Sequence, residues 1–408
     1  MKNYLVALIF SSLLWSCGND DNGFLIPSDD NQEDTVDNTG RITCESGFAD
    51  IFPCDGYDLM AHIDLQEFAS AGGNDSWGWT DPTNNREYAL MGLQEGIAFI
   101  DITSPTNPVF IGRLPTATQS SLWRDIKVFN NHAFIVSEAP GHGMQVFDLT
   151  RLRNPTNDIQ VFDADALYTE FGNAHNIIIN EDTGFAYAVG TQTFDGGPHF
   201  VNIQNPTNPV FAGGFADGTY THDAQVVTYN GPDPDYQGNE IFIGSNEDEI
   251  VVIDVTDKDN PSIISQTTYP NIGYTHQGWF TEDQRYFIAN DELDEMGFGF
   301  NTRTLIFDFS DLDAPTFLDT FVGPTEAIDH NLYVNGDNLF LSNYTAGVRI
   351  ADVSDINTIT DIGFFDTFPE SDATSFNGVW NVYPFFASGN IIVSDLNRDL
   401  FIIRRTGT

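Results

Sequence analysis

Residues 251–261 read VVIDVTDKDNP, and versions of this pattern recur along the whole chain. The pattern consists of apolar residues, an Asp, another apolar residue, Ser or Thr, several polar residues and then Pro. Its copies are centred on Asp101, Asp148, Asn202, Asp254, Asp308 and Asp352, and a degraded seventh copy covers 400–403. A regular spacing of roughly 50 residues indicates a repeat architecture in which each period forms one structural unit.

Each period contains four short runs of β-branched or aromatic residues separated by turn residues, which predicts four antiparallel strands. In the second period these runs are 126–129, 133–136, 144–149 and 159–162. Four strands in each period of about 40–50 residues are typical of a β-propeller blade. The recurring Asp at the end of each third run is predicted to be structural, accepting backbone N–H groups in the following turn.

The two ends of the repeat region complement each other. The run at 57–66 has no preceding partner, and the last period, which ends at Arg404 and Arg405, lacks its outer strand. If 57–66 supplies that strand, the ring closes without an exposed edge. We therefore predict an all-β, seven-bladed β-propeller of four-stranded antiparallel blades over 57–408, closed by its N-terminal strand. An open eight-unit array is the alternative.

The charge balance excludes some classes of partner. The 408 residues include 60 Asp and Glu but 15 Lys and Arg, which gives a formal net charge of -45. Such a chain repels nucleic-acid phosphates and anionic lipid surfaces, so nucleic-acid binding is not expected. The acidity fits either solubility in a salty or calcium-containing exterior or a cation site rich in carboxylates.

The N-terminus resembles a bacterial lipoprotein signal. Lys2 precedes the apolar stretch 4–10, and residues 14–18 read LWSCG. We predict a signal peptide over 1–16, lipidation of Cys17 and a flexible acidic tether over 17–43. The acidic residues after Cys17 resemble the surface-export signal of Bacteroidetes lipoproteins, which predicts an outer-membrane lipoprotein facing the cell surface. The alternative is an ordinary signal peptide with an incidental Cys.

Two further cysteines, Cys44 and Cys54, lie just before the repeats. In an exported protein they are expected to form a disulfide that closes the segment 44–56. A metal-binding pair is the alternative, but it lacks further Cys or nearby His.

Polar residues open the predicted innermost strands, and these strands begin around one mouth of a propeller's channel. Four consecutive blades have histidines there, so we predict a metal site of His175, His222, His276 and His330. Zn, Cu or Fe would suit several imidazoles, with Ca²⁺ or a metal-free polar ring as alternatives. The predicted ligand-binding residues around them are Asp75, Arg124, Asp125, Glu138, Asn176, Asp223, Gln277, Asp291, Asn331 and Asn377.

The remaining histidines, His62, His132, His142 and His199, do not occupy the aligned position and are predicted to be surface or turn residues. The chain contains no G-x-S-x-G, P-loop, H-E-x-x-H or Rossmann fingerprint, so no catalytic residue is assigned.

Several longer motifs resemble the choice-of-anchor B family, whose repeats are similar to those called LVIVD repeats. They are Cys44 to Cys54, NDSWGWTDP at 74–82, WRDIK at 123–127, GHGMQVFDL at 141–149, HN at 175–176, THDAQ at 221–225 and THQGW at 275–279. The resemblance covers about 44–405. It implies an exported β-propeller whose anchor differs between members, here a lipid on Cys17, and it implies no activity.

These observations predict a monomeric, surface-anchored binding module that touches the membrane only through its lipid. It would present the polar His and Asp ring to a glycan, a small molecule or a partner protein. One alternative is a metal-dependent enzyme with a transition metal held by the axial histidines. The other is a purely structural surface protein. Without a catalytic signature, binding is favoured over catalysis.

Overall fold

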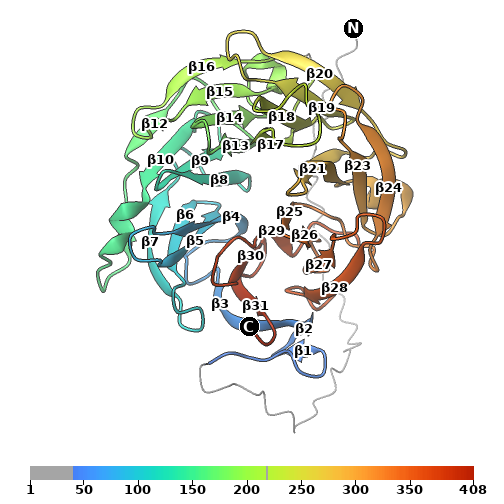
Figure 1. Ribbon diagram of the computed structural model, residues 1–408. Helices are drawn as coiled ribbons and strands as arrows, with labels where there is room; N and C mark the ends of the chain where they lie inside the picture. The colour runs from blue at the N-terminus through green and yellow to red at the C-terminus, as the bar shows by residue number, and fades with distance from the viewer. Residues whose placement is uncertain (1–39, 217–218) are drawn as a thin grey trace, which may run out of the picture. The chain divides into compact units, whose positions relative to one another are not determined.

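The computed structural model describes residues 40–216 and 219–408, and these residues include the repeat region apart from 217 and 218. The predicted signal peptide, Cys17 and most of the predicted tether lie outside the described residues. Seven antiparallel sheets stand around a central channel, each with its first strand innermost (Figure 1). The predicted all-β, seven-bladed propeller is therefore confirmed.

The blades follow one another along the chain, and each runs from the channel outward. The first four blades contain β4 (Gly73–Thr80), β5 (Glu87–Leu93), β6 (Gly96–Asp101) and β7 (Val109–Pro115); β8 (Arg124–Phe129), β9 (His132–Ser137), β10 (Met144–Asp148) and β12 (Ala166–Tyr168); β13 (Asn176–Asn180), β14 (Phe185–Val189), β15 (His199–Asn202) and β16 (Val210–Gly214); and β17 (Asp223–Thr228), β18 (Glu240–Ser245), β19 (Ile250–Asp254) and β20 (Ser262–Thr267).

The last three blades complete the circle. They contain β21 (Thr275–Phe280), β22 (Tyr286–Asp291), β23 (Arg303–Asp308) and β24 (Thr316–Val322); β25 (Leu332–Asn335), β26 (Asn338–Ser342), β27 (Val348–Asp352) and β28 (Thr360–Phe365); and β29 (Val379–Tyr383), β30 (Ile391–Asp395), β31 (Asp399–Arg405) and the N-terminal β3 (Tyr57–Asp64).

Ring closure takes place in the seventh blade. There β3 pairs antiparallel with β31, with Tyr57 opposite Arg405 and Asp64 opposite Asp399. The first strand of the repeat region thus becomes the outer strand of the last blade, as predicted. This exchange removes the free edge that an open array would expose.

The segment before β3 adds to the sixth blade. Cys44 and Cys54 form the predicted disulfide. Strands β1 (Phe48–Ala49) and β2 (Phe52–Asp55) extend that blade because β2 pairs with β28. The segment predicted as a separate disulfide loop is therefore part of the sheet.

The prediction that residues 159–162 form the outer strand of the second blade was wrong. Residues 159–162 do not pair with β10; instead β11 (Gln160–Val161) runs parallel to β7 of the first blade. The outer position is taken by β12, in which Leu167 lies opposite Gln145 of β10. Both runs are short and apolar, so local sequence could not decide which one completes the blade.

The core consists of the apolar layers between neighbouring blades. Strand β5 is buried along its whole length, because adjacent blades cover both faces of each sheet. Between the first and second blades, Phe99 of β6 stacks on Phe147 of β10 with ring centroids 4.5 Å apart.

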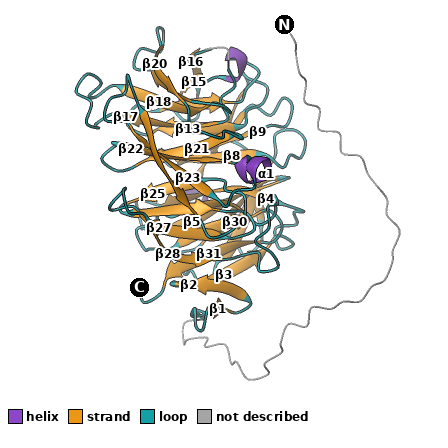
Figure 2. Ribbon diagram, turned by 90° about the vertical axis from the view of Figure 1, so that its right-hand side faces the viewer, coloured by secondary structure: helices purple, strands orange, loops and turns teal. Residues whose placement is uncertain are grey.

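Helical structure is confined to connections. The 3₁₀ turns η1 (Leu149–Arg153) and η2 (Phe194–Gly196) follow β10 and β14, and the short α-helix α1 (Asp294–Phe298) follows β22 (Figure 2). Within the described residues, no helix is both long and apolar enough to cross a bilayer.

The recurring Asp residues are structural, as predicted. Each accepts a hydrogen bond from the backbone N–H two residues further on, at 2.7–2.9 Å. The pairs are Asp101 with Thr103, Asp148 with Thr150, Asp254 with Thr256, Asp308 with Ser310 and Asp352 with Ser354. They fix the turn between the third and fourth strands.

Candidate metal centre at the channel mouth

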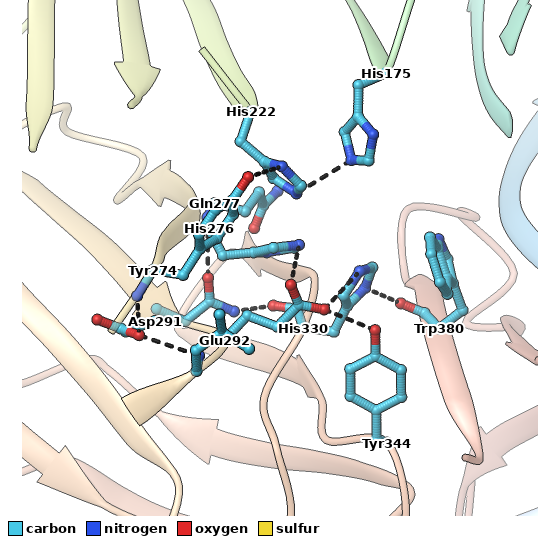
Figure 3. Close-up of polar contacts among 12 residues, drawn as sticks. His175, His222, Tyr274, His276, Gln277, Asp291, Glu292, His330, Tyr344 and Trp380 are labelled. Atoms are coloured by element: carbon cyan, nitrogen blue, oxygen red, sulfur yellow. Dashed lines mark hydrogen bonds and ion pairs between the residues drawn. The ribbon is translucent and has the colours of Figure 1, made fainter. Parts of the chain in front are cut away.

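The four aligned histidines lie side by side at the end of the channel where the innermost strands begin. His175 and His222 directly precede β13 and β17, His276 is the second residue of β21, and His330 comes two residues before β25. Neighbouring ring centroids are 4.1, 4.6 and 4.3 Å apart along the series (Figure 3). The structure thus gathers four imidazoles from four consecutive blades.

Glu292 completes this group from the loop after β22. Its Oε2 lies 4.0 Å from His276 Nε2, and its Oε1 lies 3.8 Å from His330 Nε2. Both distances are too long for a hydrogen bond. Tyr344 donates a hydrogen bond of 2.8 Å to Glu292 Oε1 and orients the carboxylate. Burial raises the pKa of Glu292 to about 7.

The protonation of His330 can be assigned from its contacts. Its Nδ1 lies 2.6 Å from the carbonyl oxygen of Trp380, and a carbonyl can only accept, so Nδ1 carries the proton. Burial lowers the pKa of His330 to about 3, which keeps the ring neutral. The Nε2 lone pair therefore faces the Glu292 carboxylate, two electron-rich groups with no hydrogen bond between them.

His222 and His276 offer further nitrogen donors. One ligand atom each from His222, His276 and Glu292 all lie within 4.8 Å of one another. Burial and the neighbouring imidazoles lower the pKa of both histidines well below the ordinary value. Both are therefore neutral and able to donate a lone pair to a metal ion.

His175 occupies a different electrostatic position. Its Nδ1 lies 2.6 Å from Glu138 Oε1, and its Nε2 lies 3.1 Å from His222 Nε2. Burial lowers the pKa of His175, but the hydrogen bond and charge of Glu138 outweigh burial and raise it. With Tyr274 Oη 2.9 Å from His222 Nδ1, His222 is held from both sides. His175 is thus a neighbour that competes for His222 Nε2.

The distances from Glu292 to His276 and His330 approach those around a small divalent ion, although His330 lies outside the group of three whose ligand atoms are within 4.8 Å of one another. Two atoms bound to one tetrahedral zinc ion at about 2.0–2.1 Å lie roughly 3.4 Å apart. The gaps of 3.8 and 4.0 Å to Glu292 exceed this by about half an ångström. A backbone carbonyl on the far nitrogen, as on His330, is the usual support for a metal-binding imidazole.

Asp291, a predicted ligand residue, has its carboxylate fully engaged. Its oxygens accept hydrogen bonds from the N–H groups of Gly273, Tyr274 and Leu293, and from the Tyr269 hydroxyl. Asp291 therefore holds the loop that positions Glu292. The adjacent Glu292, and not Asp291, faces the histidines.

Several other predicted ligand residues tie neighbouring blades together around the channel. Their side chains bond the backbone or side chain of the next innermost strand. The contacts are Asp75 with Ile126 N, Asp125 with Ile177 N, Asn176 with His222 O, Gln277 with Leu332 N and Asn331 with Asn381 Oδ1. These residues hold the ring of blades at a fixed radius.

Arg124 is also structural. Its buried guanidinium donates to Leu93 O and Thr116 Oγ1 and lies 2.9 Å from His142 Nε2. His142 and His199 are buried, so neither lies on the surface. His142 is in the predicted kind of position, a turn between β9 and β10, whereas His199 is the first residue of β15, which corrects the prediction for that residue. Tyr168 Oη lies 2.8 Å from His199 Nε2.

Asn377 does not join the ring. Its Nδ2 donates to Ser375 Oγ, before β29 begins. Asn381, within β29, takes the aligned position and donates through Nδ2 to Ser76 O of the first blade. Sequence alignment placed the seventh blade's polar residue four positions too early.

A cavity of about 370 Å³ is lined by residues of all seven innermost strands. Asp223 and Gln277, both predicted ligand residues, line this cavity. Burial raises the pKa of Asp223 to about 7. The aromatic lining was not predicted; it consists of Trp77, Trp279, Tyr333, Tyr383 and Phe385.

Sequence reasoning also missed Tyr274, Tyr344 and Trp380. All three contact a histidine or Glu292. Tyr274 belongs to a Tyr-Thr-His sequence that occurs at 220–222 and again at 274–276, whereas no repeated motif marks Tyr344 or Trp380. Glu292 was visible as part of an acidic loop after a second strand, but sequence favoured its neighbour Asp291.

Comparison with known proteins supports the architecture. No family model and no curated protein matches the chain. Among solved structures, a crystal structure of a Lactobacillus plantarum protein from a structural genomics programme superposes with a TM-score of 0.54. The two share 15% sequence identity over 73% of this chain and 84% of that one. At this identity the likeness concerns the fold alone.

Proposed function

We propose that this protein is an exported, surface-anchored binding module that holds one divalent transition-metal ion at its channel mouth. His222, His276, Glu292 and His330 would be its ligands. The observation that carries the proposal is the neutral His330, whose Nε2 lone pair faces Glu292 Oε1 across 3.8 Å. A cation between them would turn a repulsive contact into two coordinate bonds.

The donor set favours a transition metal over calcium. Imidazole nitrogen suits Zn, Cu and Fe, whereas Ca²⁺ prefers oxygen. Three neutral imidazoles and one carboxylate would leave a divalent ion with one net positive charge. This charge could attract an anionic or polar ligand to the mouth of an otherwise acidic protein.

Export and anchoring rest on the N-terminal sequence. The lipoprotein-like LWSCG at 14–18 and the resemblance to the choice-of-anchor B family support lipidation of Cys17 and display on the outer membrane. The Cys44–Cys54 disulfide is consistent with an oxidising compartment.

Metal-dependent catalysis is a second candidate, and the ligand count favours it. A zinc ion held by three protein ligands keeps a position open for water or substrate, as in catalytic sites. His222, His276 and Glu292 form such a set of three. If His330 is the fourth ligand, a four-coordinate ion has no open position and binding is the expected role.

Elemental analysis of residues 40–408, purified without chelator or His tag, tests the metal proposal. We expect about one Zn, Cu or Fe per chain, reduced at least tenfold in the His222→Ala/His276→Ala double variant. His132→Ala, which removes a histidine outside this group, should retain the metal. Equal metal content in all three proteins, or none in the wild type, would overturn the proposal.

Turnover assays separate the two candidate roles. With metal bound, the binding module should hydrolyse neither ester nor phosphoester substrates above the rate of the double variant. Turnover that disappears in His276→Ala would assign catalysis instead.

A further inference from the structure

The cavity in the central channel is distinct from the metal centre. Its lining runs from Asp223, the first residue of β17, to Glu181 and Phe385, which lie just beyond the ends of β13 and β29. Because the innermost strands begin at the mouth with the histidines, the cavity extends toward the opposite mouth. None of the proposed metal ligands lines it. A concave volume of about 370 Å³ is in the range of small-molecule sites.

One side of the cavity is a wall of aromatic rings in mutual contact. Neighbouring ring centroids are 5.0–5.9 Å apart, and the rings are those of Trp77, Trp279, Tyr333, Tyr383 and Phe385. They come from the first, fifth, sixth and seventh blades, whereas the second, third and fourth blades supply aliphatic, polar and charged side chains. The faces of such rings attract cations, and Trp does so most strongly.

Lys127 shows how this channel accommodates an ammonium group. Its Nζ lies 4.6 Å from the centre of the Trp77 ring. The same atom lies 2.6 Å from Asp125 Oδ1 and 3.9 Å from Asp75 Oδ2. The positive charge thus contacts a ring face and is balanced by buried carboxylates, so Lys127 has no charge left to balance other acidic groups of the cavity.

Two further carboxylates line the cavity without a cationic partner. Glu181 is exposed and makes no hydrogen bond or ion pair with the other described residues. Asp223 accepts a hydrogen bond of 2.6 Å from the N–H of its own neighbour, Ala224. The aligned Asp75 and Asp125 instead bond the next blade. Burial, assisted by the charge of Asp125, raises the pKa of Asp223 to about 7, and a positive charge in the cavity would oppose that shift.

We propose that the cavity binds an organic ammonium cation. The aromatic wall contacts the hydrocarbon groups on the nitrogen, and Asp223 and Glu181 balance its charge. An anionic ligand would meet two unbalanced carboxylates, and a neutral ligand would leave both unbalanced. The formal net charge of -45 also concentrates cations around the protein. This site needs no metal ion, because it shares no side chain with the transition-metal centre.

Titration calorimetry with choline, a small quaternary ammonium ion, tests the proposal. Residues 40–408 are stripped of metal and kept in chelator, so the result does not depend on the metal centre. The pH is held at about 8, where the Asp223 carboxyl is mostly charged. We expect one saturable site per chain. The uncharged analogue of choline, in which carbon replaces the nitrogen, should bind at least about tenfold more weakly.

Matched variants locate the charge that the cation meets. Asp223→Asn and Glu181→Gln should each weaken choline binding at least about threefold, because each removes one balancing charge and keeps the shape of the side chain. Asp182→Asn is the control, since it removes an exposed carboxylate that neighbours Glu181 in sequence but does not line the cavity. It should bind choline like the wild type.

A second pair of variants tests the aromatic wall. Trp279→Leu should weaken choline binding at least about threefold, whereas Trp123→Leu, which alters an exposed Trp outside the cavity, should not. The proposal is overturned if choline does not bind saturably, or if its uncharged analogue binds as tightly. It is equally overturned if Asp182→Asn weakens binding as much as Glu181→Gln does, because the effect would then come from the general acidity of the surface.

Discussion

The two ends of the blades use carboxylates in opposite ways. At one end, where the third strands finish, Asp101 and Asp254 accept backbone N–H groups two residues further on at 2.9 Å. At the other end, where the innermost strands begin, Glu292 faces His276 and His330 at 4.0 and 3.8 Å. A carboxylate that the turn itself satisfies is structural. Glu292 accepts one hydrogen bond from Tyr344 and otherwise faces neutral imidazoles, which do not balance its charge.

The pKa shifts follow the same division. The hydrogen bond to Ser354 lowers the pKa of Asp352, so folding favours its charged form. Burial raises the pKa of Glu292 to about 7, so folding disfavours its charged form. Only the second kind of site gains strongly from a bound cation.

Glu292→Gln should give the largest effect. Removing the only carboxylate among the proposed metal ligands should weaken zinc binding roughly 100-fold, because the amide oxygen is neutral and a poorer ligand. Stability without metal should not fall, since a buried, poorly paired carboxyl is lost. Competition with a chromophoric chelator measures the affinity, and unchanged zinc binding would contradict the assignment.

Asp101→Ala should show the reverse behaviour. It removes the hydrogen bond to Thr103 N and the ion pair with Arg86, both near the buried end of β6. We expect a loss of about 2 kcal/mol in the free energy of unfolding, with zinc affinity unchanged. Denaturant titration measures the free energy of unfolding, and chelator competition measures the zinc affinity. A loss of metal binding equal to that of Glu292→Gln would break the proposed distinction between the two ends.

His330→Gln should change how stability depends on pH in metal-free protein. The folded pKa of His330 is about 3, while the unfolded value is about 6.5. As pH falls from 7 to 5, the unfolded wild type takes up a proton at His330 that the folded form refuses, and stability is lost. The variant lacks this loss. Between pH 7 and 5 its free energy of unfolding should therefore rise by about 1–2 kcal/mol relative to that of the wild type. Parallel stability curves for the two proteins would refute this assignment.

Glu138→Gln should have the smallest effect. Burial lowers the pKa of His175, but Glu138 outweighs burial and raises it. Glu138 therefore favours the protonated ring, which carries a proton on Nε2 as well, 3.1 Å from His222 Nε2. Without that charge, His222 is freer to bind metal, so zinc affinity near pH 7 should rise a few-fold. The gain should vanish at higher pH, where His175 is neutral in both proteins. A large loss of affinity would instead make His175 or Glu138 a ligand.

The fold was predictable because its signals are local and repeated. An Asp at the end of the third strand marks the same turn in five blades, and the unpartnered run at 57–66 matched the missing outer strand of the last blade. The outer strand of the second blade was not predictable, because 159–162 and β12 offer similar short apolar runs. Only packing against β7 and β10 decides between them.

The candidate site was predictable only where it repeats. Four histidines share one position in four blades, so their alignment placed them together at the mouth. Asp291 and Glu292 are adjacent, and no periodicity shows which side chain faces the channel. Tyr274 was visible in a Tyr-Thr-His sequence shared by 220–222 and 274–276, whereas no repeated motif marks Tyr344. The late start of β29 displaced Asn377 from the position that Asn381 occupies.

X-ray absorption spectroscopy of zinc-loaded residues 40–408 tests the central claim most directly. The account predicts a zinc ion with two or three imidazole ligands and one carboxylate at about 2.0–2.1 Å, and loss of the imidazole signal in His222→Ala/His276→Ala. An all-oxygen environment that persists in this variant would place the metal among surface carboxylates. That result would contradict a metal centre at the channel mouth.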